Sequence, residues 1–360
     1  MSTQLQTTTP APAGADVAPA GDAGQRRATR IPLAKALNEG LRRSLATDPS
    51  VMLMGEDIGQ LGGVFRITDG LQAEFGPQRV VDSPLAESGI VGTAIGLALA
   101  GYRPVLEIQF DGFVFPAFDQ ITTQLAKMHY RSRGRLELPI VIRIPYGGHI
   151  GAIEHHSESP EAYFAHTAGL RVVTPANPHD AYTMIQQAIA SPDPVVFLEP
   201  KGHYWDKAEV DLTDEGAPDV GPDGWASLHR ARTVRAGEDL TIAAYGPTVP
   251  LALAAAKVAA EEGRDVEVID LRSIAPLDTE TVVESVERTG RLVVVHEAPT
   301  QHGIGAELAS RVTERCFHSL ESPVLRVGGF FTPFPPSSIE KEYLPSLDRV
   351  LDAVDRAFSY

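Results

Sequence analysis

Short apolar runs alternate with helical patterns along most of the chain, and this alternation constrains the fold more than any other feature. In the first half, the apolar runs lie at 51–55, 79–81, 104–108, 140–144, 171–173 and 195–199. Helical patterns lie between them at about 31–45, 69–75, 117–130 and 178–190. Because a helix that joins two strands usually returns the chain in the same direction, the alternation predicts an α/β fold. We expect a mostly parallel sheet with helices on both faces.

A second alternating unit follows a stretch where the periodicity fades. Strands are expected at 240–245, 266–269, 292–295 and 324–327, with helices at 249–262, 279–289 and 305–316. The intervening segment from Lys201 to about Arg230 is turn-rich and acidic, which is typical of a linker. The 360 residues suffice for two cores, so we expect domains at 29–205 and 231–360, joined by a linker at 206–230. Residues 1–28 are rich in Ala, Thr, Pro and Gly and are expected to form a disordered tail.

Composition excludes several classes of function. The chain has 31 Lys and Arg against 47 Asp and Glu, a net charge of -16, which argues against binding to nucleic acid or an anionic membrane. The uncharged run from Ser88 to Tyr102 is shorter than the roughly 20 apolar residues that a membrane helix needs. The single cysteine, Cys316, allows no internal disulfide and no multi-cysteine metal site. We expect a core position for Cys316 and a reducing cytoplasm as the compartment.

The stretch 82–101 places one carboxylate, Glu87, before an otherwise uncharged helical pattern. Pro84 suits the first turn of a helix, and the glycines that follow lie at 89, 92, 96 and 101. A carboxylate in such surroundings is poorly solvated, so it should hold a proton more readily than a surface glutamate. Glu87 could exchange that proton with a bound partner. The alternative is that Glu87 only complements the positive end of the helix dipole.

The glycine-flanked segment 147–161, termed the His loop, concentrates imidazoles and carboxylates. It contains His149, His155 and His156 together with Glu154, Glu158 and Glu161. These groups could move protons or hold an anionic substrate. A zinc site and a plain solvated loop are the alternatives, although the spacing matches no regular zinc pattern.

Phosphate-binding motifs and a nucleophile motif are missing from the sequence. It contains no Gly-x-Gly-x-x-Gly after a strand, no Gly-x-x-x-x-Gly-Lys-Ser/Thr, and no Gly-Asp-Gly followed at a distance by Asn. A Gly-x-Ser-x-Gly elbow is also absent, which disfavours hydrolysis through a covalent intermediate. The chain therefore has no recognisable diphosphate cradle of its own.

Seven motifs occur in an order that resembles one family. They are Gly55-Glu56-Asp57 and the segments 82–101, 107–110, 115–121, 156–161, 270–278 and 296–299. From about 31 to 358 the chain resembles the beta subunit of the thiamine-dependent 2-oxo acid dehydrogenases. The resemblance implies a transketolase-like, pyrimidine-binding domain followed by a transketolase C-terminal-like domain. It also implies a thiamine diphosphate site shared with an alpha subunit. The implied partners are this alpha subunit, in a heterotetramer of two alpha and two beta chains, and a lipoyl acyltransferase core.

The resemblance also implies roles for individual residues. Glu87 matches the glutamate that hydrogen-bonds a pyrimidine ring nitrogen, where its proton favours the imino tautomer of the cofactor. His156 matches a histidine that orients the substrate or the lipoyl group, although the doublet with His155 leaves open which imidazole acts. The residues implied to line the cofactor are Glu56, Leu85, Glu87, Gln109 and Phe113. Magnesium is expected on the alpha subunit, and a structural potassium ion is implied at Val141, Ala188, Ser191 and Asp193.

The motifs also bear on the substrate. The runs 108–110, 115–120, 130–132 and 159–166 look more like branched-chain members of the family than pyruvate members. Branched-chain 2-oxo acids are therefore the expected substrates, and pyruvate is the alternative. A hypothesis of another class is a non-catalytic docking subunit whose acidic C-terminal domain recruits a basic partner.

Overall fold

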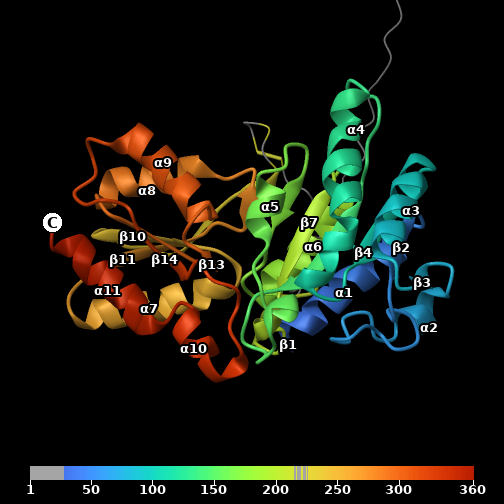
Figure 1. Cartoon of the computed structure of the whole chain (residues 1–360), viewed down its shortest axis with the longest axis horizontal. Helices are drawn as coiled ribbons and strands as arrows, with labels where there is room; N and C mark the ends of the chain where they lie inside the picture. Colours follow the sequence, from blue (N-terminus) through green and yellow to red (C-terminus); the bar gives the residue numbers. More distant parts are fainter. Residues whose placement is uncertain (1–27, 215, 217–219, 222–223, 225) are drawn as a thin grey trace, which may run out of the picture.

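The chain forms two α/β lobes side by side (Figure 1). The structure is a computed structural model that describes residues 28–214, 216, 220–221, 224 and 226–360. The predicted tail therefore lies outside the described residues except for Ala28, which begins strand β1 (Ala28–Pro32). The helix expected from Ile31 begins two residues later, as α1 (Leu33–Thr47).

The N-terminal lobe is built on a seven-stranded sheet in the order β12-β6-β7-β5-β4-β2-β3. Six of these strands run parallel, and β12 pairs antiparallel at one edge. The bounds are β2 (Val51–Gly55), β3 (Val80–Asp82), β4 (Arg103–Glu107), β5 (Val141–Tyr146), β6 (Arg171–Val173), β7 (Val195–Pro200) and β12 (Ser273–Ala275). The predicted parallel sheet is confirmed.

Helices cover both faces of this sheet because the strand residues alternate between two cores. In β7, Val195 and Phe197 join the core beneath α1 and α6, whereas Val196 and Leu198 face the core that contains α3. The helices of this lobe, after α1, are α2 (Leu71–Phe75), α3 (Glu87–Leu99), α4 (Ala126–Arg131), α5 (Glu161–Ala165) and α6 (Pro178–Ala190). The short helical turns are η1 (Asp111–Ala117), η2 (Gln120–Leu125), η3 (Glu154–His156) and η4 (Lys201–His203).

The C-terminal lobe has a five-stranded sheet in the order β14-β13-β10-β11-β9, in which β9 alone is antiparallel among the described strands. The strands are β9 (Arg232–Arg235), β10 (Leu240–Ala244), β11 (Val266–Asp270), β13 (Leu292–Pro299) and β14 (Leu325–Gly329). The helices are α7 (Val249–Glu261), α8 (Thr279–Thr289), α9 (Ile304–Cys316), α10 (Glu340–Tyr343) and α11 (Leu347–Phe358), with turns η5 (Ser227–His229), η6 (Gly246–Thr248) and η7 (Ser337–Ile339). Side chains of α8 and α9 pack on one face of the sheet, and those of α7 and α11 pack on the other.

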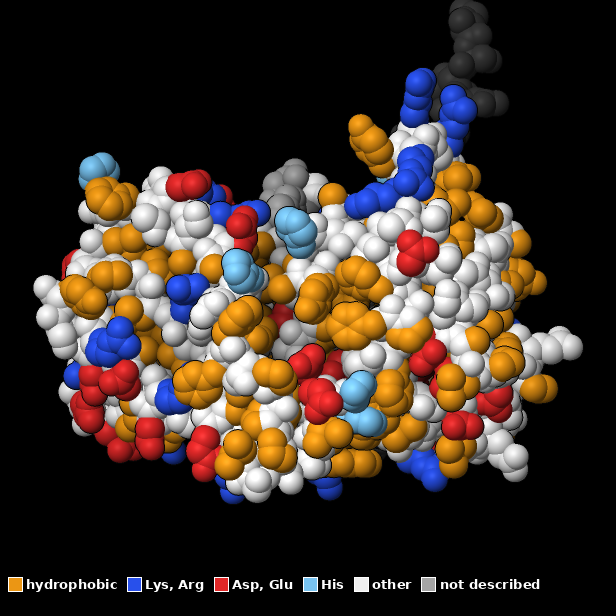
Figure 2. All heavy atoms as spheres, viewed as in Figure 1, with side chains coloured by type: hydrophobic (Ala, Val, Ile, Leu, Met, Phe, Trp, Pro, Cys, Tyr) orange, Lys and Arg blue, Asp and Glu red, His pale blue; other side chains and the backbone are white. Residues whose placement is uncertain are grey.

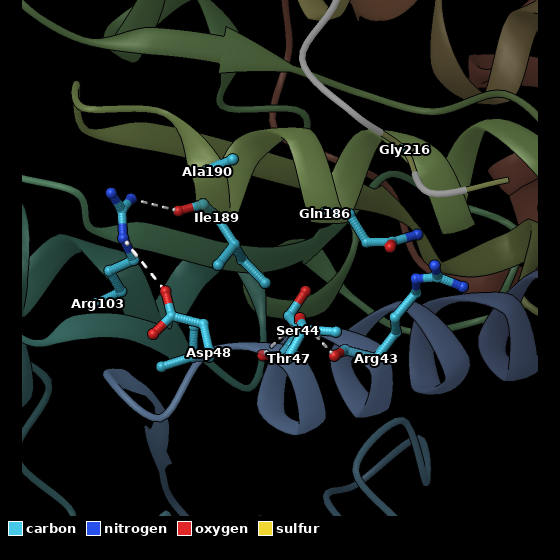
Figure 3. A pocket seen from close by; sticks show the side chains of 10 residues that line it. Arg43, Ser44, Thr47, Asp48, Arg103, Gln186, Ile189, Ala190 and Gly216 are labelled. Atoms are coloured by element: carbon cyan, nitrogen blue, oxygen red, sulfur yellow. Dashed lines mark hydrogen bonds and ion pairs between the residues drawn. The ribbon is translucent and has the colours of Figure 1, made fainter.

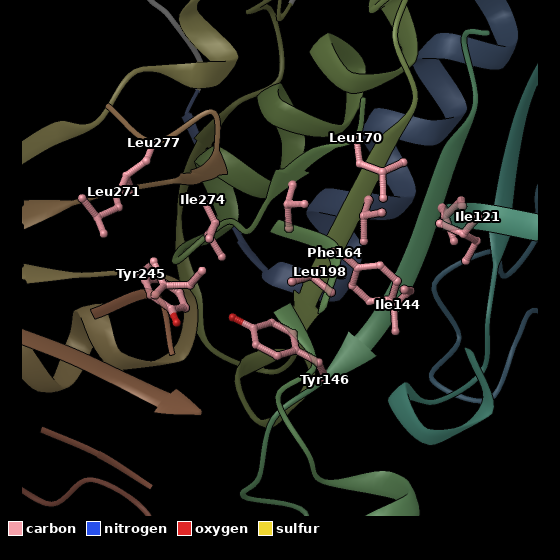
Figure 4. Close-up of a cluster of buried hydrophobic side chains, with 14 of the residues drawn as sticks. Ile121, Ile144, Tyr146, Phe164, Leu170, Leu198, Tyr245, Leu271, Ile274 and Leu277 are labelled. Carbon is pink, nitrogen blue, oxygen red and sulfur yellow. The ribbon is translucent and has the colours of Figure 1, made fainter. Parts of the chain in front are cut away.

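One hydrophobic core continues from the first lobe into the second. It contains Phe164 and Leu198 of the N-terminal lobe together with Leu271 and Ile274 of the C-terminal half (Figure 4). Ile274 lies in β12, which pairs with β6 and so adds a C-terminal segment to the N-terminal sheet. The two lobes therefore share both a core and a sheet.

Several predicted segments differ from the structure. The predicted linker contains β8 (Lys207–Asp211), which pairs with β1 along its whole length. The helix expected at 117–130 is present from Gln120 to Arg131, but its first half, η2, is a π-helix and only its second half, α4, is α-helical, with the turn η1 before it. Pro116 lacks a backbone N–H and stands at the end of the first turn, where a regular helix would need that donor. Cys316 is 3% exposed in the shared core, which confirms the position expected for it. Among the described residues, none of the helices combines the length and apolar character needed to cross a membrane.

Candidate active site

The predicted site residues gather at the edge where the parallel strands of the N-terminal sheet end. Glu56 follows β2, Gln109 follows β4 by two residues, and β3 leads into Leu85 and Glu87. The His loop follows β5 at the same edge. Parallel α/β sheets bind ligands at the carboxyl ends of their strands, since the loops there converge. We call this edge the site edge.

Glu56 and Glu87, termed the carboxylate pair, lie together at the site edge. Glu87 is the first residue of α3 and is 9% exposed. In the part of the chain that the structure describes, its carboxylate has neither a hydrogen-bond donor nor a cation as partner. Glu56 is 8% exposed, and its Oε1 atom is buried without a hydrogen-bond partner among the described residues. The pair therefore presents one buried acceptor atom, Glu56 Oε1, and a second carboxylate that both lack donors among the described residues.

The two carboxylates are close enough to influence each other. Burial raises the pKa of Glu56, and the charge of Glu87 raises it further. The backbone N–H of Ala86 opposes both effects by donating to the Glu56 carboxylate. A ligand that brings a hydrogen-bond donor or a proton would relieve the repulsion between the two groups.

The other residues expected at the cofactor take different positions around this pair. Gln109 lies beside Glu56, since its Nε2 is 3.4 Å from the Glu56 carbonyl oxygen and 3.5 Å from Asp57 Oδ2. Phe113 lies in η1 and is partly buried against the shared core. Leu85 precedes α3 and is 82% exposed, so its side chain contacts solvent rather than the core. An exposed leucine at this place leaves apolar surface for another molecule to cover.

His156 lies against two aromatic rings, whereas His155 extends toward solvent. The ring centroid of His156 is 4.3 Å from that of Phe110 and 5.2 Å from that of Phe113. The side chain of His155 is 63% exposed and its Nδ1 is 3.2 Å from a Glu154 carboxylate oxygen. Burial lowers the pKa of His156, and the positive charges of Lys201 and His155 lower it further. These effects favour the neutral imidazole, which can accept a proton.

The C-terminal lobe holds both ends of the His loop. Glu297 of β13 accepts a hydrogen bond from the Gly148 N–H at 3.0 Å and pairs with His149 Nε2 at 2.9 Å. At the other end, Tyr245 donates to Glu161 Oε1 at 2.7 Å. The hydrogen bond to Glu297 raises the pKa of His149, and burial raises the pKa of Glu161 to about 7. Glu297 and Tyr245 of the C-terminal lobe thus bind both ends of the His loop.

Sequence reasoning did not single out Asp111, Lys201 or Tyr245. Asp111 and Lys201 are 1% and 2% exposed, and Lys201 Nζ donates to Asp111 Oδ1 at 2.9 Å. Their signal in the sequence is weak: Lys201 directly follows the apolar run of β7, and Asp111 follows the run of β4 by four residues. The position of each charged residue just after a buried strand is the only local pattern that points to the site edge.

The implied potassium site is at the opposite edge of the sheet and stays a prediction. The positively charged side chains of Arg103 and Arg171 contact two of the four implied residues, Ser191 and Asp193. Arg103 donates to the carbonyl oxygens of Ile189 at 2.9 Å and Ser191 at 3.4 Å, and Arg171 pairs with the Asp193 carboxylate at 2.7 Å. The remaining candidates are Val141, inside β5, and Ala188, whose carbonyl accepts the Ser191 N–H at 3.2 Å. Arg103 thus binds one carbonyl oxygen of the implied set, and Arg171 binds a side chain of it, so two positive charges lie close to the predicted potassium site.

A cavity of about 390 Å³ opens beside the same region, between the C-terminal ends of α1 and α6 (Figure 3). Arg103 extends across one side of it, paired with Asp48 and with the Ile189 carbonyl (Figure 3). Its lining includes the first residues of β2 and β4, so it lies far from the ends where Glu56 and Gln109 stand. The cavity is separate from the site edge.

Comparisons with known proteins connect the chain to one group. Residues 29–206 match the transketolase pyrimidine binding domain, and residues 229–350 match the transketolase C-terminal domain. A pyruvate dehydrogenase E1 component subunit beta from Leifsonia xyli is 61% identical over 95% of this chain and 99% of its own length. A 3-methyl-2-oxobutanoate dehydrogenase subunit beta from Mycobacterium tuberculosis is 50% identical over 91% of both chains.

Solved structures agree with these similarities. The chain resembles a split-gene transketolase, solved as an inactive beta4 tetramer, with a TM-score of 0.71 and 25% identity. The alignment covers 91% of this chain and 98% of the other. The two-lobed fold is therefore that of a known enzyme group.

Proposed function

The chain belongs to the transketolase-like family of beta subunits of 2-oxo acid dehydrogenase E1 components, and from this premise we propose how its residues take part in catalysis. In this proposal the chain binds the pyrimidine half of thiamine diphosphate at the site edge. The carboxylate pair carries the proposal, because Glu56 Oε1 is buried without a donor and the largely buried Glu87 has no hydrogen-bond donor or cation as partner among the described residues. An aminopyrimidine ring offers the donors that these atoms lack.

Each residue of the site edge has a proposed task. Glu87 holds a proton on the pyrimidine ring, and Glu56 and Gln109 fix the edge of the ring. Phe113 and Leu85 provide the apolar surfaces that exclude water. Thiamine diphosphate, when bound, supplies a carbon nucleophile for the 2-oxo carbon and accepts the electrons released on decarboxylation.

His156 is the proposed histidine of the second half-reaction. Its ring is held by Phe110 and Phe113, and the neighbouring charge of Lys201 favours its neutral form. A neutral imidazole at this place can orient the acyl acceptor and take up a proton during transfer to a lipoyl group. His155 is exposed and is not assigned this task.

The proposed site is completed by an alpha subunit. The sequence has no diphosphate-binding motif, and the ligands for the magnesium ion and the diphosphate must therefore come from another chain. Exposed apolar side chains at the site edge support such a partner: Leu85 is 82% exposed, Tyr163 57% and Phe115 42%. The likeness to a split-gene transketolase whose beta chains form an inactive tetramer supports the same division of labour.

The proposed substrates are branched-chain 2-oxo acids, on the strength of the motif resemblance. Two relatives carry names of that type, the 3-methyl-2-oxobutanoate dehydrogenase subunit of M. tuberculosis and the 2-oxoisovalerate dehydrogenase subunit of Pseudomonas aeruginosa, which is 45% identical. Pyruvate is the second candidate, because the relative at 61% identity is named a pyruvate dehydrogenase subunit.

Coexpression with the alpha subunit tests two parts of the proposal, the substrate class and the site shared between the subunits. The reconstituted complex should decarboxylate 3-methyl-2-oxobutanoate with a higher kcat/KM than pyruvate, while the isolated chain decarboxylates neither. The reverse order of the two substrates would overturn the branched-chain assignment alone. Full activity of the isolated chain would overturn the shared site.

A docking subunit without catalytic residues is the competing proposal, and the acidic charge of the chain supports it. Acidic side chains spread over the C-terminal lobe, while Lys and Arg side chains gather at the protruding end of α4 (Figure 2). A basic partner would favour the acidic lobe. If Glu87→Gln leaves decarboxylation by the reconstituted complex unchanged, the docking proposal is the better one.

A further inference from the structure

A buried ion pair lies near the proposed catalytic histidine. Asp111, in η1, and Lys201, in η4, come from segments that follow different strands, and both side chains are almost fully buried. Desolvating two charges is costly unless the geometry and the additional hydrogen bonds compensate. We therefore looked at which further hydrogen bonds the two buried side chains make and which segments they join.

The second oxygen of Asp111 binds the His loop. Asp111 Oδ2 accepts the backbone N–H of Glu158 at 2.9 Å, two residues beyond His156. The carbonyl of Glu158 in turn accepts the N–H of Gly147 at 3.0 Å. Asp111 thus connects Lys201, on one side, to the backbone of the segment that carries His156, on the other.

Gly112 brings the same two segments into direct contact. A Cβ atom at Gly112 would lie 2.5 Å from the carbonyl oxygen and 2.8 Å from the Cα of His155, which is closer than side chains tolerate. The backbone of η1 therefore packs against the backbone of η3. This contact does not involve the ion pair, but it also holds the segment around His155 and His156 against η1.

We propose that Asp111 and Lys201 are positioning residues that hold the segment 154–158 against η1, so that the His156 ring lies against Phe110 and Phe113. The inference rests on the proposed role of His156 in acyl transfer. Lys201 also places a positive charge near the imidazole, which disfavours the protonated ring. Neither residue needs to touch the substrate for these effects.

The test separates the two half-reactions of the reconstituted complex. Decarboxylation is followed with an artificial electron acceptor, and acyl transfer is followed as acylation of a free lipoyl domain. The double variant Asp111→Asn/Lys201→Met removes both charges together, so that no unpaired charge is left buried. It should slow acyl transfer about 10- to 100-fold, since a small misplacement of a catalytic group has this size of effect, and slow decarboxylation less than about 3-fold.

Two further variants protect the test against misfolding. Gly112→Ala displaces η3 from η1 without changing any charge, and should give the same selective loss. Arg315→Met is the matched control, because its partner Glu280 forms an exposed ion pair far from the site edge, and it should leave both rates unchanged. Because Lys201 disfavours the protonated ring, the double variant should also move the acidic limb of the acyl-transfer pH profile to higher pH.

The outcomes distinguish the proposal from its premise. If His156→Ala leaves acyl transfer intact, the assigned role of His156 is wrong. If His156→Ala slows acyl transfer but the double variant and Gly112→Ala do not, the positioning role alone is wrong. Equal loss of both half-reactions in the folded double variant would also overturn the positioning role.

Discussion

Two groups of buried carboxylates share the N-terminal sheet, and their surroundings differ. Glu107 and Glu199 lie within the sheet on either side of Arg143, which donates to Glu107 Oε2 at 2.7 Å and to Glu199 Oε1 and Oε2 at 2.7 and 3.0 Å. Glu56 and Glu87, at the site edge, have no cation between them among the described residues. One group has a cation inside the protein and the other does not.

The difference separates a structural role from a binding role. The buried cluster of Glu107, Arg143 and Glu199 connects three strands, β4, β5 and β7, and takes its cation from inside the protein. A largely buried carboxylate pair with too few donors costs stability and persists where a ligand supplies the missing partners. Comparing the two groups by substitution tests this separation.

The largest effect is expected for Glu87→Gln in the reconstituted complex. The amide keeps the volume of the side chain but cannot exchange a proton with the pyrimidine, so kcat for decarboxylation should fall about 10²- to 10⁴-fold. The Tm of the chain should stay within about 2 °C, since no partner within the described chain is lost. A fall in Tm with unchanged kcat would assign Glu87 to the structural group.

Arg143→Met should give the opposite result. Removing the guanidinium leaves Glu107 and Glu199 buried without their cation, which should lower the free energy of unfolding by about 3–5 kcal/mol. Urea unfolding followed by circular dichroism measures the change. Lys35→Met, which breaks an exposed pair with Glu39, is the control and should change stability by less than about 0.5 kcal/mol. A loss for Arg143→Met as small as that of the control would remove the contrast between the two groups.

Glu161 is an intermediate case, because Tyr245 binds one of its oxygens and the other is buried without a partner among the described residues. Its pKa is raised to about 7 from 4.5, so the folded state binds its proton more tightly than the unfolded state. The stabilisation is complete below the unfolded pKa and is lost as the pH rises through about 7.

Comparing wild type with Glu161→Gln isolates this contribution. Between pH 4.5 and 7, wild type should lose on the order of 1–3 kcal/mol of stability relative to the variant, because the amide does not titrate. Thermal unfolding at a series of pH values is the measurement. Parallel curves for the two proteins would show that the free oxygen of Glu161 has no energetic consequence.

The smallest effect is expected from potassium. Because Arg103 and Arg171 already provide cations at the implied potassium residues, replacing KCl by NaCl at equal ionic strength should change Tm by less than about 1 °C. A fall of several degrees in NaCl would restore the potassium site. It would also show that Arg103 does not take the place of the ion.

Local patterns predicted the regular elements of both lobes well. The bounds of β6 and α6 agree with the sequence expectation to the residue, because turn residues flank each run and Asn177 caps the helix by accepting the Asp180 N–H. The helix α11 was not expected, although Ser346 caps it and apolar residues recur at helical spacing from Leu347 to Phe358. These two features are a complete local signal for a helix.

Other features could not be found by local reasoning. The strand β12 has three residues, and it is a strand because β6 lies beside it rather than because of its own composition. Asp111 and Lys201 are separated by 90 positions, so no spacing rule connects them. The resemblance implies Glu56 and Glu87 together, but the unpartnered state of Glu56 Oε1 depends on the packing of β2, β3 and α3, which no local pattern contains.

The pairing of β12 with β6 has a consequence for synthesis on the ribosome. The strands of the N-terminal sheet up to β7 are translated by residue 200, but the edge beside β6 stays open until residues 273–275 emerge. Until then the nascent chain exposes the backbone donors and acceptors of β6, which can pair with another chain. Completing the first lobe thus waits for the second to be translated, and a fragment that ends in the segment 206–230 would be released with that edge uncovered.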